Sequence, residues 1–267
     1  MTPTPQTWHY GLVAQWWAEF NTEGPEIAYF RQCIARYGQP ALDVACGTGR
    51  LLLPYLRAGL DVDGCDLSTD MIDLCRTKAE AAGLAPHLYA QAMHALALPR
   101  TYKTIFICGG LGLGGSRPHD REALRRMYHH LDPGGVLVFD HHLPYKSAEA
   151  WQYWTAAKRH QLPQAWPSSG QRQRAANGDE YELKLRVADV NPLEQTETLQ
   201  IRVALWREGK LVAAEEKSLR VCAYLTQELL LMLTQAGFHD VSVQSAYTER
   251  EATAEDGVLV FTTKKEN

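Results

Sequence analysis

A buried strand that ends in a glycine turn constrains this chain more than any other feature of its sequence. Residues 42–50 read Leu-Asp-Val-Ala-Cys-Gly-Thr-Gly-Arg, and three leucines follow directly. The pattern predicts a strand, a turn and the start of a helix, because glycine lets the backbone turn tightly and lets a ligand approach it closely. Asp66 ends a second short strand, 60–65, seventeen residues after Gly49. A carboxylate at that position suits a vicinal diol, so the two features together predict a site for a ribose-bearing cofactor at the carboxyl ends of parallel strands.

The glycine turn leaves two classes of cofactor open. A dinucleotide fold is marked by G-x-G-x-x-G, in which the third glycine allows tight packing of helix and strand. Gly47 and Gly49 supply the first two glycines, but Leu52 stands at the third position. The dinucleotide pattern is therefore incomplete, and a nucleotide-dependent oxidoreductase is kept as an alternative.

Strands and helices alternate along the first half of the chain. The expected strands are 41–46, 60–66, 87–93, 104–108 and 136–140, and the expected helices are 50–58, 68–82 and 121–130. Two helices, 8–20 and 26–37, precede them, and Ser68 is suited to cap the helix that follows it. Alternation of this kind predicts a parallel sheet with helices on both faces.

The pattern changes after residue 146. A helix is expected over 148–160 and a loop over 161–170, followed by the alternating segments 181–190, 198–206 and 211–225. Leu199, Ile201, Val203 and Leu205 share one face of the second segment, and Gln200, Arg202 and Ala204 share the other. These segments predict an antiparallel meander inserted into the parallel fold, before a helix over 226–236 and two closing strands, 241–244 and 258–263.

The spacing acid-x-small-x-Gly-x-Gly, here Asp43, Ala45, Gly47 and Gly49, resembles that of the class I S-adenosylmethionine-dependent methyltransferases. The string Leu-Asp-Val-Ala-Cys-Gly-Thr-Gly is especially similar to that of members that methylate small amines, such as glycine and amino-sugar N-methyltransferases. Ala45 departs from the pattern, which more often has glycine there. The resemblance implies an α/β fold: a doubly wound, mostly parallel seven-stranded sheet with an antiparallel β meander inserted after strand five.

The resemblance also implies a division of the chain into domains. Residues 1–38 are expected to form an N-terminal helical lid. Residues 39–145 and 226–267 are expected to form the cofactor-binding α/β core. Residues 146–225 are expected to form an inserted helix and antiparallel sheet that cap the substrate.

S-adenosylmethionine would be held by residues at the carboxyl ends of the strands. The resemblance implies that Asp43 orders the turn or meets the methionine amino group, and that Asp66 takes both ribose hydroxyls. The acid that usually follows strand three is absent, so the adenine contact falls to the backbone of Ala92 and Met93 or to Gln91. The implied cofactor contacts are Tyr10, Asp43, Ala45, Cys46, Gly47, Gly49, Asp66, Leu67, Met71, Ala92, Met93 and Cys108. Leu67 and Met71 would pack on the adenine, and filling of the core is the alternative for Met71.

Candidate catalytic groups follow strand five and lie in the N-terminal helices. His141 and His142 come directly after Asp140, and either imidazole could act as a base or orient the acceptor. A solvated loop histidine is the alternative. Tyr10 is expected to close over the cofactor. Metal binding is not expected, because adjacent side chains on an extended backbone point to opposite sides.

Composition excludes other classes of function. A net charge of −4 and the lack of a basic run argue against a nucleic-acid surface. Residues 108–111 read Cys-Gly-Gly-Leu, without the Asn/Asp-Pro-Pro-aromatic motif that grips a flipped base. The six cysteines form no C-x-x-C pair, no apolar run reaches about 18 residues, and the first residues lack a signal-peptide pattern. We therefore expect a cytoplasmic protein that binds neither nucleic acid nor membrane, with its oligomeric state left open.

These observations predict an enzyme that transfers a methyl group from S-adenosylmethionine to a small-molecule acceptor and releases S-adenosylhomocysteine. An amine nitrogen is the favoured acceptor and a hydroxyl oxygen the second choice, because an amine needs only to arrive neutral. The alternatives are an NAD-type oxidoreductase and a cofactor-binding protein without transfer activity.

Overall fold

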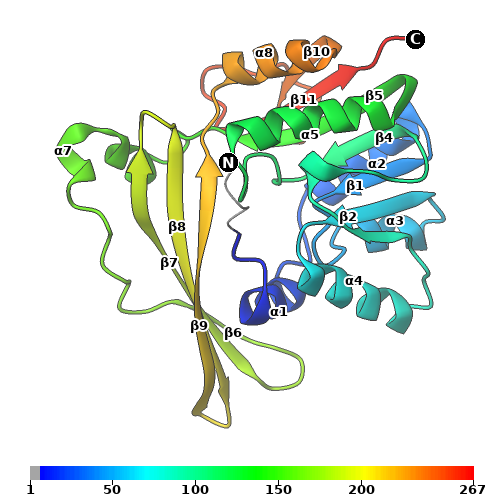
Figure 1. Ribbon diagram of the computed structural model, residues 1–267. Coiled ribbons are helices and arrows are strands. Elements are labelled where there is room, and N and C mark those ends of the chain that lie inside the picture. The colour runs from blue at the N-terminus through cyan, green and yellow to red at the C-terminus, as the bar shows by residue number, and fades with distance from the viewer. Residues whose placement is uncertain (1–6) are drawn as a thin grey trace. The chain divides into compact units, whose positions relative to one another are not determined.

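The computed structural model describes residues 7–267, which form two compact units (Figure 1). Unit 1 comprises residues 7–22, 112–116 and 147–223, and unit 2 comprises residues 23–111, 117–146 and 224–267. Each unit has its own sheet.

Unit 2 is built on a seven-stranded sheet in the order β10-β11-β5-β4-β1-β2-β3. The strands are β1 (Ala41–Val44), β2 (Val62–Asp66), β3 (Leu88–Ala90), β4 (Tyr102–Ile107), β5 (Leu131–His142), β10 (His239–Ser245) and β11 (Val258–Lys264). Strands β1 to β5 run parallel, and β11 runs antiparallel to β5. Because β1 pairs with both β2 and β4, the strand order reverses beside it. In doubly wound sheets, ligands bind at the carboxyl ends of the strands at this switch point.

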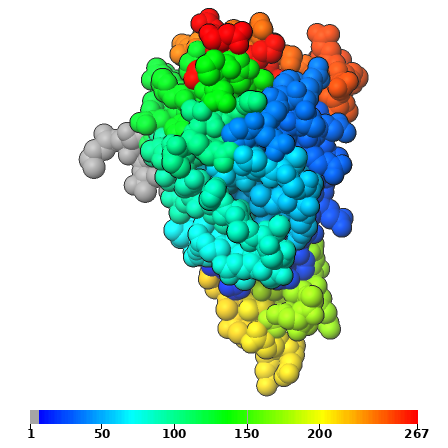
Figure 2. All heavy atoms as spheres, turned by 90° about the vertical axis from the view of Figure 1, so that its right-hand side faces the viewer, coloured from blue at the N-terminus to red at the C-terminus, as the bar shows by residue number. Residues whose placement is uncertain are grey.

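Helices pack on both faces of this sheet. They are α2 (Glu26–Tyr37), α3 (Leu52–Arg57), α4 (Thr69–Ala81), α5 (Arg117–His130) and α8 (Thr226–Ala236). Helices α2, α3 and α4 share one apolar cluster with the strands, in which Phe30, Tyr55 and Phe106 are fully buried. The segments that contain α2, α3 and α4, blue to cyan in Figure 2, form one continuous surface. Side chains of neighbouring residues in each strand point to the opposite face of the sheet. Helices α5 and α8 lie side by side (Figure 1).

Helix ends in unit 2 follow their local sequence signals. The Ser68 hydroxyl accepts a hydrogen bond of 3.2 Å from the Met71 N–H and so caps α4, as the sequence predicts. Gly237 follows α8 with φ +100°, in the left-handed region that glycine adopts at helix ends.

Unit 1 contains a four-stranded antiparallel sheet in the order β6-β7-β8-β9. The strands are β6 (Gln171–Arg174), β7 (Glu180–Asn191), β8 (Thr196–Arg207) and β9 (Lys210–Cys222). Helix α1 (Gly11–Phe20) contacts β8 and β9, and Trp8 and Trp16 join the apolar cluster of one sheet face.

The predicted two-faced pattern of β8 is confirmed, except that Ala204, on the face with Gln200 and Arg202, is also buried. Ile201, Val203 and Leu205 are buried, Leu199 is partly buried on the same face, and Arg202 on the other face is exposed. The seven-stranded, mostly parallel sheet and the antiparallel insertion match the expected fold class.

The structure differs from the expected elements at four places. The helix expected over 148–160 is broken into α6 (Ala148–Trp151), the 3₁₀ turn η2 (Gln152–Trp154) and α7 (Ala156–Arg159), because Thr155 adopts an extended backbone with ψ 144°. The strand expected over 87–93 ends at Ala90, and Met93 begins the 3₁₀ turn η1 (Met93–Ala95). Strand β6, polar throughout, lies just after the expected loop, where no strand was expected. Strand β5 begins earlier than expected, with an irregularity over 132–135 where β4 pairing shifts from Leu131 to Val136.

Candidate cofactor and acceptor site

The glycine turn directly follows β1 and contains three residues with left-handed backbones. Ala45, Gly47 and Gly49 have φ values of +61°, +53° and +85°. A side chain on Gly49 would meet the Cys75 sulfur at 2.7 Å, whereas one on Gly47 would meet no atom within 4 Å. Gly49 is therefore needed for packing, and Gly47 leaves one side of the turn open to a ligand. The left-handed φ at Ala45 explains why glycine is the commoner residue there.

Asp66 joins this turn to the start of α4. Its Oδ2 accepts from the Gly47 N–H at 2.9 Å, and its Oδ1 accepts from the Ser68 N–H at 2.8 Å. Burial raises the pKa of Asp66, and these two hydrogen bonds oppose the rise. Each carboxylate oxygen has a further lone pair, so this carboxylate, fixed in orientation, can still accept two hydroxyl groups.

Asp43 lies within β1, beneath the turn. It is 2 % exposed, and burial raises its pKa well above the usual range. Cys46 is also buried, and its N–H donates to the Cys65 carbonyl, which continues the β1–β2 pairing into the turn.

The ends of β1 and β4 meet η1 at Gly110. A side chain on Gly110 would lie 2.8 Å from the Ala45 Cβ and 3.8 Å from the Met93 Cε. Ala92 and Met93 are half-buried there. The structure therefore brings together the glycine turn, the end of β4 and the segment after β3, as the sequence predicts.

Leu67 and Met71 differ in exposure. Leu67 is half-buried, whereas Met71 is 2 % exposed on the inner face of α4. The observed burial fits a core role for Met71. Contact of either residue with adenine stays a prediction.

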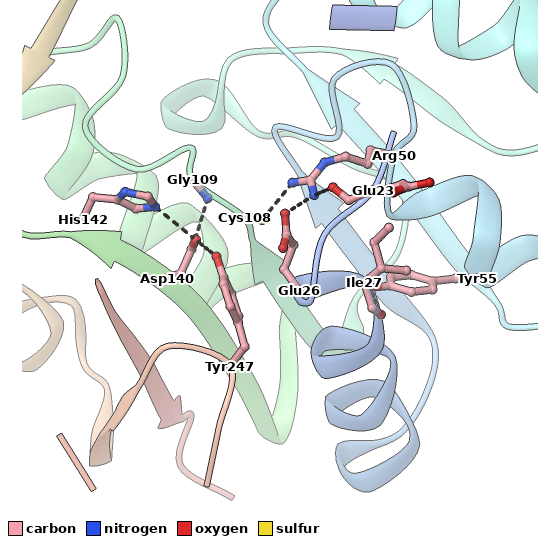
Figure 3. Close-up of polar contacts among 10 residues, drawn as sticks. All are labelled: Glu23, Glu26, Ile27, Arg50, Tyr55, Cys108, Gly109, Asp140, His142 and Tyr247. Carbon is pink, nitrogen blue, oxygen red and sulfur yellow. Dashed lines mark hydrogen bonds and ion pairs between the residues drawn. The ribbon is translucent and has the colours of Figure 1, made fainter. Parts of the chain in front are cut away.

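Arg50 links the turn to α2, a contact that the sequence does not predict (Figure 3). Its guanidinium bonds the Glu26 carboxylate and the Glu23 carbonyl, and lies 3.4 Å from the Cys108 sulfur. The side chains of Arg50 and Glu26 are only 15 % and 13 % exposed. A largely buried, paired arginine directly after Gly49 fixes the first turn of α2 against the end of β4.

Asp140, near the carboxyl end of β5, is the centre of a second polar cluster (Figure 3). Its Oδ2 accepts from the Tyr247 hydroxyl at 2.6 Å, and its Oδ1 accepts from the Gly109 N–H. The His142 Nε2 lies 4.0 Å from Oδ2, and the His142 Nδ1 contacts the Lys146 amine. Burial raises the pKa of Asp140, and the Tyr247 hydrogen bond opposes the rise.

The two candidate histidines have different surroundings. His141 is buried, and its Nε2 lies 3.1 Å from the Tyr224 carbonyl; burial lowers its pKa to about 4. The His142 side chain is 47 % exposed and faces Asp140. Of the two histidines, His142 is therefore the one whose ring can exchange a proton with Asp140. Tyr10 precedes α1 in unit 1, and its closure over the cofactor stays a prediction.

Two further findings concern metals and membranes. Within residues 7–267, His, Cys, Asp and Glu form no group of three or more that could hold a metal ion. In the same range, every helix is too short or too polar to cross a membrane.

The fold and the glycine turn define a class I methyltransferase architecture, and comparison with known proteins agrees. Residues 41–135 match the family described as "Methyltransferase domain". Residues 41–135 therefore form a methyltransferase domain, and the enzyme class that the comparisons support is that of the S-adenosylmethionine-dependent methyltransferases. This identification favours the methyltransferase over the dinucleotide oxidoreductase that the turn alone left open.

Relatives and solved structures cover nearly the whole chain. A protein of Geobacillus sp. (strain WCH70) described as a methyltransferase is 27 % identical over 261 residues, which are 94 % of this chain and 97 % of that protein. The fold is similar to that of the sugar N-methyltransferase KedS8 from Streptoalloteichus sp. (TM-score 0.71, 16 % identity, 100 % of both chains). It is also similar to that of an S-adenosylmethionine-dependent methyltransferase from Clostridium acetobutylicum (TM-score 0.71, 15 % identity, 96 % of this chain and 98 % of that chain).

Proposed function

We propose that this enzyme transfers the methyl group of S-adenosylmethionine to an amine nitrogen of a small molecule. In this proposal, the open side of Gly47 receives the methionine portion of the cofactor, and Asp66 receives the ribose hydroxyls. The methyl group then lies near Gly109 and Gly110, where β4 ends. The proposal follows from the switch point beside β1, because ligands of doubly wound sheets lie outside the carboxyl ends of the strands.

The observation that carries the amine assignment is the environment of Asp140. This carboxylate is buried, and its two hydrogen bonds come from a phenol and a peptide N–H, both of them neutral groups. Neutral donors do not compensate the charge of a buried carboxylate. Burial also lowers the pKa of His142, 4.0 Å away, which favours its neutral form. A buried charge without a cationic partner is costly. An ammonium group of the acceptor would compensate it, whereas a neutral hydroxyl would not.

The chemistry of methyl transfer is consistent with this choice. The sulfonium already activates the methyl carbon, so positioning and exclusion of water can supply much of the acceleration, up to about 7–11 kcal/mol. The sugar N-methyltransferase KedS8, similar in fold along its whole length, adds support for a small amine acceptor.

A paired acceptor screen tests the proposal. Each amine, amino sugars included, is assayed beside the alcohol in which a hydroxyl replaces the amino group, and release of S-adenosylhomocysteine is measured. We expect turnover with at least one amine and much less with its matched alcohol. Turnover confined to the alcohols would overturn the amine assignment and favour oxygen as the acceptor.

A further inference from the structure

We propose that Asp140 accepts the proton that the acceptor ammonium must lose, that His142 passes this proton to solvent, and that Tyr247 is the positioning residue that holds Asp140. This inference rests on the proposed function, because it assigns roles within the same amine site. Of these three residues, only His142 is a candidate from the sequence alone.

The reaction releases one proton, which passes to Asp140. An acceptor ammonium first gives a proton to the Asp140 carboxylate and becomes a neutral amine. The nitrogen lone pair then forms a bond to the methyl carbon while the carbon–sulfur bond breaks and its electron pair stays on sulfur. The products are a methylated ammonium and neutral S-adenosylhomocysteine. The proton on Asp140 must leave before the next turnover.

The carboxylate of Asp140 is held from both sides. The Gly109 N–H fixes Oδ1 and the Tyr247 hydroxyl fixes Oδ2 (Figure 3). Since each oxygen can accept a second hydrogen bond, the group can still receive an ammonium proton. Burial raises the pKa of Asp140, which brings it closer to that of an amine and makes it a stronger base.

Tyr247 is held in place by its own loop despite a strained backbone. Its φ of +52° lies in the left-handed region, which is uncommon for a tyrosine. The loop is fixed by Asp256, which accepts from Ser245 and Thr253 at 2.8 Å each and pairs with Arg250. Strain that is maintained by surrounding structure is frequent at functional sites.

His142 connects Asp140 to solvent. Its ring lies 4.0 Å from Asp140 on one side and contacts Lys146 on the other, and nearly half of the side chain is exposed. Burial and the nearby Lys146 charge lower the pKa of His142. A neutral imidazole between a buried acid and water can take a proton and release it. The other titratable or charged groups beside this cluster are Cys108, which follows β4, Glu26 from α2, and His141, next to His142 on β5. Arg50 acts on Cys108.

The test compares variants with an amine that the wild type methylates. Asp140→Asn should lower kcat by at least about 100-fold, the usual range for loss of a general base. It should also move the acidic limb of the pH profile from the pKa of Asp140 to that of the acceptor ammonium, which must then lose its proton to solvent, while S-adenosylhomocysteine still binds. Tyr247→Phe should move that limb to higher pH, because the carboxylate loses a stabilising hydrogen bond. Tyr29→Phe is the matched control: its hydroxyl bonds Gln244, 3.1 Å away, so the limb should stay in place.

The relay has its own readout. His142→Gln should lower kcat in dilute buffer, and added imidazole should restore it, because a small buffer base can replace the missing ring. Asp140→Glu keeps a carboxylate and should retain an acidic limb set by the pKa of that carboxylate even if its turnover falls.

The possible failures are distinguishable. Absence of methylation of every amine by the wild type would overturn the proposed function. Methylation of an amine, with Asp140→Asn retaining both kcat and the position of the acidic limb, would overturn the role of Asp140 alone. A His142→Gln defect that imidazole does not restore would overturn the relay.

Discussion

The Oδ2 of Asp66 lies 2.9 Å from the backbone nitrogen of Gly47. This hydrogen bond ties the end of β2 to the glycine turn after β1, and the other carboxylate oxygen ties it to the start of α4. The residue proposed to bind the ribose is therefore also the residue that orders the turn. Changes in either part should affect cofactor binding and local structure together.

Gly49 and Gly59 have similar φ angles, +85° and +75°. Alanine substitutions at the two positions therefore distinguish the effect of crowding from that of conformational strain. Gly49→Ala should lower the free energy of unfolding by about 2–4 kcal/mol, because the added methyl meets both Cys75 and Leu53 within 3 Å. Gly59→Ala, with φ +75° and open space around it, should cost only about 1–2 kcal/mol. Urea unfolding of both variants measures the difference. Equal losses would show that crowding at Gly49 contributes nothing.

Ala45→Gly should stabilise the protein. Ala45 has φ +61°, which costs a residue with a side chain about 1–2 kcal/mol. Glycine removes this strain and loses part of the gain through the greater freedom of the unfolded chain, so we expect a net gain of roughly 0.5–1 kcal/mol. Ala58→Gly, at a position with φ −81°, serves as the control and should be slightly destabilising. A loss of stability in Ala45→Gly would show that the Ala45 methyl packs favourably.

Glu197 should make the stability of the protein depend on pH. Burial on the face of β8 that carries Leu199 and Ile201 raises the pKa of Glu197 to about 7. The native state therefore binds a proton that the unfolded state has released between about pH 4.5 and 7, and stability falls as the pH rises through this window. Glu197→Gln should be more stable than the wild type at pH 8 by on the order of 2 kcal/mol, after allowance for partial exposure.

Urea unfolding at pH 5 and pH 8 checks this prediction. The wild type and Glu197→Gln should converge at pH 5, where the native glutamate is protonated. The exposed control Glu255→Gln should keep the pH dependence of the wild type. An unchanged difference between wild type and Glu197→Gln at the two pH values would contradict the account.

The sequence predicted those features whose signals are local. The turn, Asp66 and the Ser68 cap lie within 26 residues, and each follows from the conformational freedom of glycine or from a short polar side chain beside a helix start. Period-two alternation likewise located the buried face of β8, because residues two apart in a strand share a face.

The sequence could not predict contacts between distant segments. Tyr247 and Asp140 are 107 residues apart, and their pairing depends on the antiparallel return of β11 beside β5. The Arg50–Glu26 pair likewise depends on how α2 packs against β4. The helix expected over 148–160 is broken for a different reason. The Thr155 hydroxyl donates to the Gln152 carbonyl, and local hydrogen bonds of this kind compete with helix formation.

Calorimetric titration of S-adenosylhomocysteine into the wild type and Asp66→Ala tests the central claim most directly. The wild type should bind, and Asp66→Ala should bind more weakly by roughly 1.5–3 kcal/mol, the range for hydrogen bonds to charged groups. Asp73→Ala is the control, because Asp73 lies exposed on α4 and pairs with Arg76; it should bind as the wild type does. Unfolding in urea shows whether Asp66→Ala is folded at the titration temperature. Full affinity in a folded Asp66→Ala would contradict the assignment of the cofactor site to Asp66 and the glycine turn.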